Sequence, residues 1–377
     1  MQRAMQSGRI SGDAPFTQRC HRFFEEKCGF NKSFLTTSCT HALEMAALLS
    51  DIQPGDEVIM PSYTFVSTAN AFALRGAKIV FADSSPDNPN IDARRLERHI
   101  TPKTKALVVV HYAGIACDMD AIMAIAEYHN LLVIEDAAQA IDAYHYDRPL
   151  GSIGHFGAFS FHETKNITCG EGGLLTVNVP TLAKRAEIIR EKGTNRAAFY
   201  RGEVDKYGWV DIWSSFLPSD LLAAFLYAQL EGLPSIQQKR LGIWENYRQM
   251  LAPLAETGAF SLPFVPAYAR HNAHIFYLVF PNGKERDRVM KTLREVGIQA
   301  PFHYLSLHGS RYFKEQYGGP PLFQSDRYTH CLLRLPLYAD LTGKEQLQVV
   351  GQIHDCFAHK LNRKVAATKV PKSGAMV

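Results

Sequence analysis

The stretch Leu131-Leu-Val-Ile-Glu-Asp-Ala-Ala-Gln139 is the part of the sequence that best indicates the fold. Four apolar residues follow one another without a polar residue between them, and two carboxylates, Glu135 and Asp136, close the run. A short continuous apolar run is typical of a strand that is buried on both faces, as in a parallel sheet. The stretch therefore predicts a central strand that ends in charged residues.

The same pattern recurs on both sides of this stretch. Strands that alternate with helices predict an α/β fold with a mostly parallel sheet, covered by helices on both faces. Ligands bind such sheets at the carboxyl ends of the strands, so the residues that follow the strands are the first candidates for a site. We expect strands at 57–60, 78–82, 106–110, 131–134, 158–161 and 174–177, and helices at 40–49, 119–130 and 181–192.

The second part of the chain indicates a smaller α/β unit. A helical pattern covers residues 220–251 and weakens at Pro234, and a strand at 275–280 and helices at 285–296 and 344–359 follow. Because 377 residues are many for one hydrophobic core, we expect two domains. The expected domains are 1–232, which is large, and 233–377, whose polar tail from about residue 363 we expect to be disordered.

Composition is that of an ordinary globular protein, with 46% hydrophobic and 21% charged residues. The net charge of +4 is small for this length, so nucleic acid is not an expected partner. Seven scattered cysteines without a C-x-x-C pair do not form a disulfide framework. The N-terminus lacks an apolar signal segment, and the run at 106–110 is too short to cross a bilayer. We therefore expect a cytoplasmic protein with no membrane partner.

Residues that can carry chemistry follow the predicted strands. Ser160-Phe-His-Glu-Thr-Lys165 ends one strand, and the glycine-rich Cys169-Gly-Glu-Gly-Gly173 comes next. Most lysines are solvated surface charges, and an aspartate such as Asp136 more often caps a helix. Together, however, Lys165 and Asp136 favour pyridoxal 5'-phosphate (PLP): the lysine would form a Schiff base, and the carboxylate would keep the ring nitrogen protonated.

Further residues match the other needs of this cofactor. Thr36-Thr-Ser-Cys-Thr-His-Ala42 precedes a predicted helix, whose free N–H groups and hydroxyls could bind a phosphate together with Ser160, although an ordinary N-cap is the plainer interpretation. Phe65 could stack on the ring, where core packing is the commoner role. Gln139 could reach the ring hydroxyl, or could be a plain polar helix residue. Lys165 would need a lowered pKa to carry a proton, which partial burial supplies.

Other chemistries match the sequence less well. Neither the dinucleotide-binding G-x-G-x-x-G pattern after the first strand nor the phosphate-binding G-x-x-x-x-G-K-[ST] pattern occurs. His162-Glu163 lacks the second histidine of a zinc-binding H-E-x-x-H motif. The fifteen histidines show no paired ligand spacing, so we expect no metal.

In their order and spacing these segments resemble the PLP-dependent sugar aminotransferases of the DegT/DnrJ/EryC1/StrS family. The resemblance runs from about residue 10 to about residue 355. It implies fold type I of the PLP-dependent transferases and a homodimer in which both subunits build each active site. The motifs that carry it are Ser38-Cys-Thr-His-Ala-Leu-Glu44, Pro61-Ser-Tyr-Thr-Phe65, Glu135-Asp-Ala-Ala-Gln139, Ser160-Phe-His-Glu-Thr-Lys165, Gly170-Glu-Gly-Gly173, His303-Tyr-Leu-Ser-Leu-His308 and Leu335-Pro-Leu337.

The resemblance also implies roles for single residues. Lys165 takes the place of the Schiff-base lysine and Asp136 that of the partner of the pyridine nitrogen. Gln139 lies near the ring oxygen and Phe65 at the stacking position. The remaining positions are Thr40, His41 and Ser160 at the phosphate and, on a loop expected near the sugar nucleotide, His303, Tyr304 and His308, each of which could equally be structural.

Segments 160–166, 191–196 and 204–209 resemble one branch of the family closely, the dTDP-4-amino-4,6-dideoxygalactose transaminases of enterobacterial common antigen synthesis. This resemblance implies that L-glutamate donates an amino group to C4 of dTDP-4-keto-6-deoxyglucose. Three alternatives stay open: an aminotransferase acting on another nucleotide ketosugar, a PLP-dependent sugar dehydratase, and a PLP-binding regulatory module without turnover. The related dehydratases carry histidine where this chain has Lys165, which favours amino transfer.

The sequence departs from the family pattern in two places. Ser215 stands where many members carry an asparagine that reaches the partner's cofactor phosphate, and Leu217 stands where arginine is usual. A serine hydroxyl can still bond a phosphate, so Ser215 remains a cofactor-binding candidate, whereas Leu217 cannot replace a cation. The chain also begins close to Ser11-Gly12-Asp13, and we expect the extended N-terminal segment of family members to be absent.

Overall fold

A seven-stranded sheet forms the centre of the computed structural model, which describes residues 1–358. The strand order is β1-β9-β8-β5-β4-β2-β3. Neighbours from β8 to β3 pair in parallel, and β9 alone runs antiparallel to both of its neighbours, so the sheet is mixed but mostly parallel, as predicted. The strands are β1 (Ser33–Thr36), β2 (Glu57–Pro61), β3 (Lys78–Ala82), β4 (Thr104–Val110), β5 (Leu132–Asp136), β8 (Phe156–Ser160) and β9 (Gly173–Val177).

Helices cover both faces of this sheet, and each strand contributes to both hydrophobic layers. Val108 packs with residues of α3 and α6 on one face, and its neighbour Val109 packs with residues of α5 on the other. Because successive side chains of a strand point to opposite faces, only an uninterrupted apolar run can fill both layers. The helices are α3 (Cys39–Leu49), α4 (Val66–Ala73) and α6 (Ala183–Arg190) on the first face, and α2 (Pro15–Lys27), α5 (Met119–Tyr128) and α8 (Asp220–Glu231) on the second.

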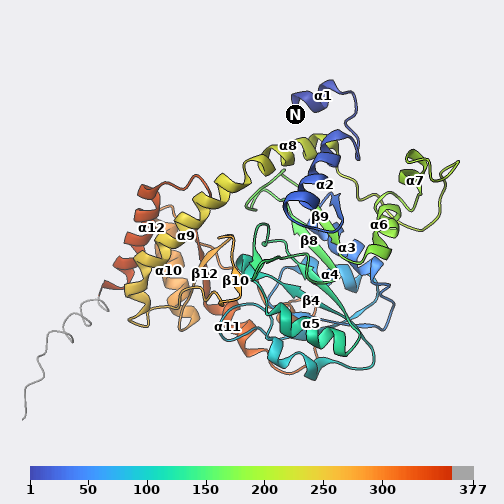
Figure 1. The fold of residues 1–377 in the computed structure, drawn as a ribbon. Helices are drawn as coiled ribbons and strands as arrows, with labels where there is room; N and C mark the ends of the chain where they lie inside the picture. The colour runs from blue at the N-terminus through green and yellow to red at the C-terminus, as the bar shows by residue number, and fades with distance from the viewer. Residues whose placement is uncertain (359–377) are drawn as a thin grey trace, which may run out of the picture.

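The long helix predicted at 220–251 is in fact two helices. Helix α8 ends at Glu231, and α9 (Leu233–Ala255) begins after Gly232. The predicted pattern only weakened at Pro234, and this residue lies in the first turn of α9, where the N–H that proline lacks would have no helical partner. Figure 1 shows α9 running away from the large sheet, with α10 and α12 beside its far end.

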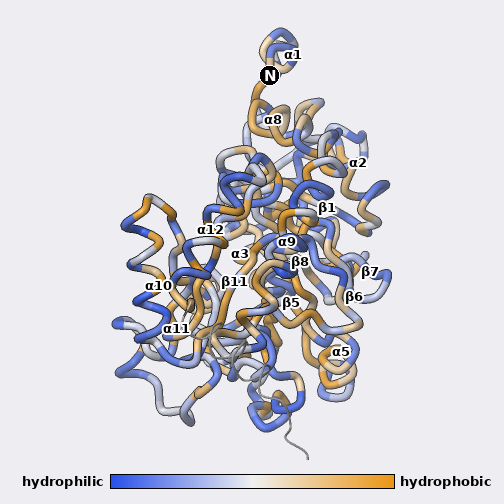
Figure 2. Tube along the Cα trace, turned by 90° about the vertical axis from the view of Figure 1, so that its left-hand side faces the viewer, coloured by the Kyte–Doolittle hydropathy of each residue, from blue (hydrophilic) through white to orange (hydrophobic). Residues whose placement is uncertain are grey.

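A second hydrophobic core lies around α9. Strands β11 (Phe276–Val279) and β12 (Leu332–Leu335) pair antiparallel, and α10 (Gly283–Glu295) and α12 (Gly343–Cys356) pack with them. Helix α10 carries both hydrophilic and hydrophobic residues (Figure 2), and its buried Val289 and Leu293 pack into this core. A domain boundary at residue 232 stays a prediction.

The tail from residue 363 and the end of the helix predicted at 344–359 lie outside the described residues. Within residues 1–358 we find no helix with the length and apolar character that a membrane span requires.

Several short elements were not predicted from the sequence. They include α1 (Gln2–Gln6), β6 (Tyr144–His145), β7 (Arg148–Pro149), α7 (Arg196–Tyr200), β10 (Ala269–Arg270) and α11 (Phe323–Cys331).

Candidate active site

A cavity of about 1440 Å³ opens at the carboxyl ends of the parallel strands. The ends of β4, β5 and β8 and the first turn of α3 line it from the large sheet, and residues 296–305 and β12 line it from the second core. This is the position at which a doubly covered parallel sheet binds its ligand. Eight of the predicted site residues line the cavity, namely Thr40, Phe65, Asp136, Gln139, Ser160, Lys165, His303 and Tyr304.

Asp136 is held in one orientation at the end of β5. It is only 5% exposed, and its Oδ2 accepts a hydrogen bond of 2.7 Å from the hydroxyl of Thr68. Its Oδ1 accepts a bond of 3.1 Å from the backbone N–H of Ala138. Burial raises the pKa of Asp136, and these two bonds oppose that shift. A buried carboxylate of this kind gains from a cationic partner in the cavity.

Lys165 lies near this carboxylate, on the turn that follows β8. Its backbone N–H donates a bond of 2.9 Å to the carbonyl of His162, which closes the turn. Burial lowers the pKa of Lys165, whereas the neighbouring Cys39 and Asp136 raise it. A lowered pKa increases the fraction of neutral amine, which is the form that can act as a nucleophile or take up a proton.

The first turn of α3 forms a cradle for an anion. Ser38 caps the helix, since its hydroxyl accepts a bond of 3.1 Å from the N–H of His41. The hydroxyl of Thr40 lies 2.8 Å from that of Ser67 on α4. The first N–H groups of an α-helix lack helical partners and favour negative charge. With Ser160 on the same cavity, these groups suit the phosphate of PLP.

At one position of the glycine cluster that follows Lys165, Gly173, the packing requires a residue without a side chain. A Cβ atom at this position would lie 2.3 Å from the carbonyl carbon of Ser38 and 2.5 Å from the backbone nitrogen of Cys39. Only glycine therefore lets β9 approach the first turn of α3 so closely.

Gln139 connects the large sheet to the loop that carries Tyr304. Its Oε1 accepts a bond of 2.6 Å from the N–H of Ala113, and its Nε2 donates a bond of 2.8 Å to the hydroxyl of Tyr304. The Tyr304 ring stacks on His303 with centroids 3.7 Å apart. Phe65 is 54% exposed and lies 6.2 Å from the Tyr304 ring, so aromatic rings surround this part of the cavity.

Three predicted site residues lie outside the cavity lining. The His41 ring bonds the hydroxyl of Thr37, and His308 bonds Ser62 over 2.7 Å, so both rings connect structural segments. Ser215 is exposed and pairs through its backbone with Glu191. Within this subunit, therefore, none of the three lines the cavity, and their ligand roles stay predictions.

Several cavity residues were not predicted from the sequence. Thr68, which bonds Asp136 from outside the cavity lining, follows the aromatic motif by one helical turn, and no local pattern connects it with Asp136. Arg334 interrupts the otherwise apolar strand Leu332–Leu335, which is a signal that the sequence did contain. His274 and Cys39 also line the cavity, and burial lowers the pKa of His274 well below its ordinary value.

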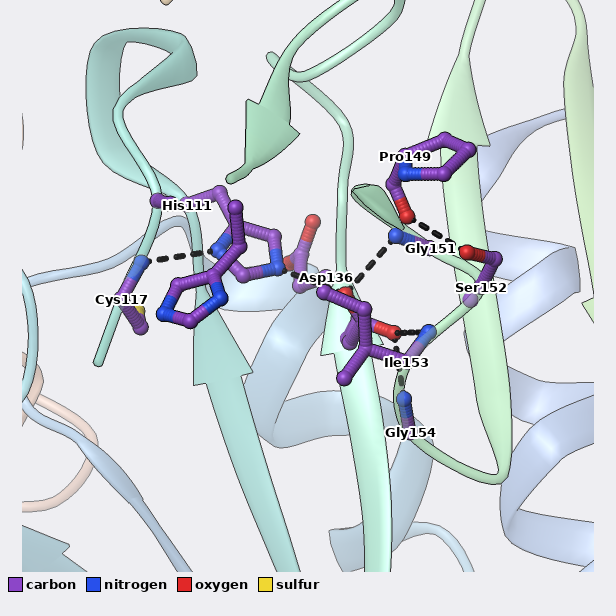
Figure 3. Close-up of polar contacts among 12 residues, drawn as sticks. His111, Cys117, Asp136, Pro149, Gly151, Ser152, Ile153 and Gly154 are labelled. Atoms are coloured by element: carbon purple, nitrogen blue, oxygen red, sulfur yellow. Dashed lines mark hydrogen bonds and ion pairs between the residues drawn. The ribbon is translucent and has the colours of Figure 1, made fainter. Parts of the chain in front are cut away.

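A buried network around Glu135 holds the strand that ends in Asp136. Glu135 is fully buried and accepts bonds from the N–H groups of Gly151, Ile153 and Gly154, at 2.7, 2.8 and 2.6 Å. Figure 3 shows this loop on one side of the end of β5, with His111 on the other. The carboxylate thus fixes the loop that leads into β8.

His111, which directly follows β4, completes this network. Its Nδ1 accepts a bond of 3.2 Å from the N–H of Cys117, so the ring proton lies on Nε2 and is donated to Glu135 over 2.9 Å. The backbone N–H of His111 also donates to the carbonyl of Asp136 over 3.2 Å. Glu135 and His111 are therefore positioning residues beside the cavity (Figure 3).

The sheet topology, and the cavity that brings Lys165 and Asp136 together, define an aminotransferase fold. The chain belongs to the DegT/DnrJ/EryC1/StrS aminotransferase family, whose model matches residues 1–354. Aminotransferases of this family depend on PLP, and the protein is a sugar aminotransferase.

Known proteins resemble the chain along nearly its whole length. It is 34% identical over 360 residues to the spore coat polysaccharide biosynthesis protein SpsC of Bacillus subtilis, covering 93% of this chain and 92% of that protein. The aminotransferase from Psychrobacter cryohalolentis shares 28% identity and a TM-score of 0.89, with 95% of each chain covered. S. venezuelae DesV, solved with a ketimine intermediate, shares 29% identity and a TM-score of 0.84, over 94% of this chain and 92% of that one.

Proposed function

We propose that the protein transfers the amino group of L-glutamate to C4 of dTDP-4-keto-6-deoxy-D-glucose. The products would be dTDP-4-amino-4,6-dideoxy-D-galactose and 2-oxoglutarate. The observation that carries the amino transfer is that Lys165 and Asp136 line one cavity and interact electrostatically. The choice of sugar rests on the resemblance of segments 160–166, 191–196 and 204–209 to one branch of the family.

The residues present suit PLP in this cavity. Asp136 would face the ring nitrogen, and Phe65 the face of the ring. The phosphate would bind at the first turn of α3, with the hydroxyls of Thr40, Ser67 and Ser160. When bound, PLP supplies an electron sink for the carbon that gains or loses the amino group.

The protein's own side chains would orient the reactants and move protons. Lys165 would hold the cofactor covalently at rest and carry a proton to and from the reacting carbon, because its lowered pKa makes the neutral amine accessible. Thr68 and the N–H of Ala138 would keep Asp136 in place. The lysine distinguishes amino transfer from the dehydration performed by relatives that carry histidine there.

Segments 191–196 and 204–209, which follow α6, form one surface unit. Arg196 bonds Glu191 over 2.5 Å, and Thr194 pairs with Trp209 through the backbone. Gly193 lies so close to this pairing that a Cβ atom would meet the carbonyl oxygen of Asp211 at 1.7 Å. Trp209 is 78% exposed. An exposed apolar surface supports our proposal that this unit contacts a second subunit in a homodimer, which would carry Ser215 toward the partner's cavity.

The test combines a product assay with a variant at Lys165. Protein incubated with PLP, L-glutamate and the ketosugar should give a 4-amino sugar of galacto configuration by NMR, and borohydride should fix PLP to Lys165. Lys165→Ala should abolish turnover. A gluco or 3-amino product would contradict the sugar assignment, and a deoxygenated ketosugar without nitrogen would indicate a dehydratase. Bound PLP without amination of any nucleotide ketosugar would indicate a regulatory module.

A further inference from the structure

His274 lies two residues before β11 and lines the cavity, with 8% of its surface exposed. It contacts the residue that follows Lys165, because Nδ1 of His274 is 2.7 Å from Oδ1 of the buried Asn166. This bond connects the loop that leads into the second core with the turn that carries the reactive lysine. The chemical state of the His274 ring therefore matters for what Lys165 meets in the cavity.

The partners of Asn166 determine where the ring proton of His274 lies. Nδ2 of Asn166 is 2.9 Å from the backbone carbonyl of Asn272 and 2.8 Å from Oε1 of Gln237. A carbonyl only accepts, so this end of the amide is the NH2 group, and both of its hydrogens are used. Oδ1 of Asn166 is then an acceptor, and Nδ1 of His274 donates its proton to it. In the neutral ring, Nε2 consequently carries a free lone pair.

The surroundings of His274 keep its ring neutral. Burial lowers the pKa of His274 well below its ordinary value, and positive neighbours lower it further. One of them, Arg240, donates a bond of 2.8 Å to the backbone carbonyl of His274 and is held beside it. Nε2 is therefore a hydrogen-bond acceptor at neutral pH. The titratable and charged groups that act on the ring are those of Lys165, Arg240, His303 and Arg334.

Two complementary groups of the cavity lack a partner in the described part of the chain. Within residues 1–358, Nε2 of His274 accepts no hydrogen bond and Nζ of Lys165 donates none. Neither atom is among the buried polar atoms without a partner, so both are open to the cavity. His274 also interacts electrostatically with Lys165. An acceptor and a donor thus approach the same part of the cavity, one from each hydrophobic core.

The other acceptors near Lys165 are engaged or weak. Asp136 would face the ring nitrogen of bound PLP. Burial raises the pKa of Cys39 well above its ordinary value, so its sulfur stays a thiol, which is a weak acceptor. Nδ1 of His303 bonds the hydroxyl of Tyr112 over 2.8 Å, and because a hydroxyl can donate or accept, this bond does not fix the tautomer of His303. His274 is the ring whose free lone pair the contacts specify.

We infer that Nε2 of His274 accepts a hydrogen bond from the Lys165 amine whenever that amine is not bound to the cofactor. The inference rests on the proposed function, in which Lys165 holds PLP at rest and carries protons when it is free. The bond keeps the free amine at one place in the cavity, so His274 is a positioning residue and Asn166 is its support. A bond to the ammonium form opposes the effect of burial on the pKa of Lys165, so that this residue can both take up and release a proton.

The test measures the pKa of Lys165 in protein saturated with pyridoxamine 5'-phosphate, the aminated form of the cofactor, which leaves the lysine free. Acetic anhydride acylates only the neutral amine, and mass spectrometry of the Lys165 peptide gives the extent of acylation at each pH. In His274→Asn the amide can still donate to Asn166 but does not reach the position of Nε2, so the pKa of Lys165 should fall by about one unit. His274→Gln places an amide oxygen near that position and should recover at least about half of the shift.

His271→Asn is the matched control, because His271 is on the same loop and lies outside the cavity lining. The pKa of Lys165 in this variant should stay within about 0.2 units of wild type. An unchanged pKa in His274→Asn would overturn the inference. A fall in His303→Asn but not in His274→Asn would also overturn it and would assign the acceptor to His303. A rise in His274→Asn would do the same, since the ring would then only keep water from the amine.

A measurement on the wild-type protein decides the matter if His274→Asn does not fold. In nitrogen NMR of histidine-labelled protein, Nε2 of His274 should appear as an unprotonated nitrogen, identified by its absence in His274→Gln. Its signal should move upfield when pyridoxamine 5'-phosphate replaces PLP, because Lys165 is then free to donate. A protonated Nε2, or a signal that does not move, would overturn the inference. Neither arm contains a ketosugar or an amino donor, so failure of the sugar assay would not be mistaken for failure here.

Discussion

The hydroxyl of Thr68 on α4 donates a hydrogen bond of 2.7 Å to Oδ2 of Asp136 at the end of β5, and both side chains are buried. The bond connects the helix after β2 with the strand that carries the carboxylate. The hydroxyl of Thr64 lies 2.8 Å from that of Thr68 and extends the chain of hydrogen bonds. Asp136 thus has its orientation fixed before any ligand binds, which reduces the entropy that binding must overcome.

Thr68→Val should weaken PLP binding by about tenfold or more, because a hydrogen bond to a charged group contributes about 1.5–3 kcal/mol. Valine matches threonine in shape, so the packing of α4 is retained. Removal of this donor should raise the pKa of Asp136 further, which disfavours the carboxylate that the ring nitrogen needs. Fluorescence titration of the apoprotein with PLP measures the effect. Thr64→Val is the control and should have a smaller effect; equal losses in both variants would contradict the role of the direct bond.

Glu135→Gln should destabilise the fold by about 2–5 kcal/mol, because a carboxylate can accept all four bonds of this network and an amide cannot. The amide NH2 group would face N–H donors of the 151–154 loop or of His111. Urea unfolding at pH 7 measures the loss. Glu97→Gln is the control, because Glu97 is 64% exposed and its contact with His129 is at the surface. A loss equal to that of the control would show that the buried network is dispensable.

The sequence predicted the large sheet because each of its central strands fills two hydrophobic layers, which requires an uninterrupted apolar run. It predicted Lys165 and Asp136 as neighbours because both follow strands, and the carboxyl ends of parallel strands meet at one edge. It also identified the glycine cluster, although the contact of Gly173 with Ser38 depends on how β9 packs against α3.

The rest of the site depends on tertiary packing that no local pattern encodes. Arg334 reaches the cavity only because β12 docks beside residues 301–304, far from the other site residues in sequence. The His308 ring is held by Ser62 instead of facing the cavity, although it lies in the same motif as His303. The helix break at Gly232 was not predicted, because the sequence showed one helical pattern that only weakened at Pro234, and proline is tolerated in a first turn.

Gly173→Ala should impair PLP binding more than it impairs the fold. The new methyl group would lie 2.3 Å from the backbone of Ser38, so the first turn of α3 must move away from β9. We expect about a tenfold or greater loss of PLP affinity, because this turn supplies the phosphate-binding N–H groups. Gly242→Ala is the matched control, since a Cβ atom there would have no neighbour within 4 Å and alanine favours a helix. Equal PLP affinity in the two variants would contradict the proposed cradle.

Buried histidines should make the protein less stable as the pH falls below 6.5. Burial lowers the pKa of His21 to about 3 and that of His271 to about 4. Each ring accepts a backbone N–H bond, His21 from Leu35 at 2.9 Å and His271 from Ala273 at 3.1 Å, and so must stay neutral in the fold. Between pH 6.5 and 4 the unfolded chain therefore binds more protons than the folded chain. The free energy of unfolding then falls by up to about 1.4 kcal/mol per pH unit for each histidine.

The contribution of His271 can be separated by substitution. In His271→Asn, the side-chain oxygen can still accept the bond from Ala273 but does not titrate, so the slope of unfolding free energy between pH 6 and 5 should decrease by up to about 1.4 kcal/mol per pH unit. Urea unfolding of the PLP-saturated protein at these pH values gives the slope. His330→Asn is the control, because His330 is exposed on α11 and stays in water in both states. If wild type and His271→Asn have the same slope, His271 is protonated in the folded protein, and its bond to Ala273 must break as the pH falls.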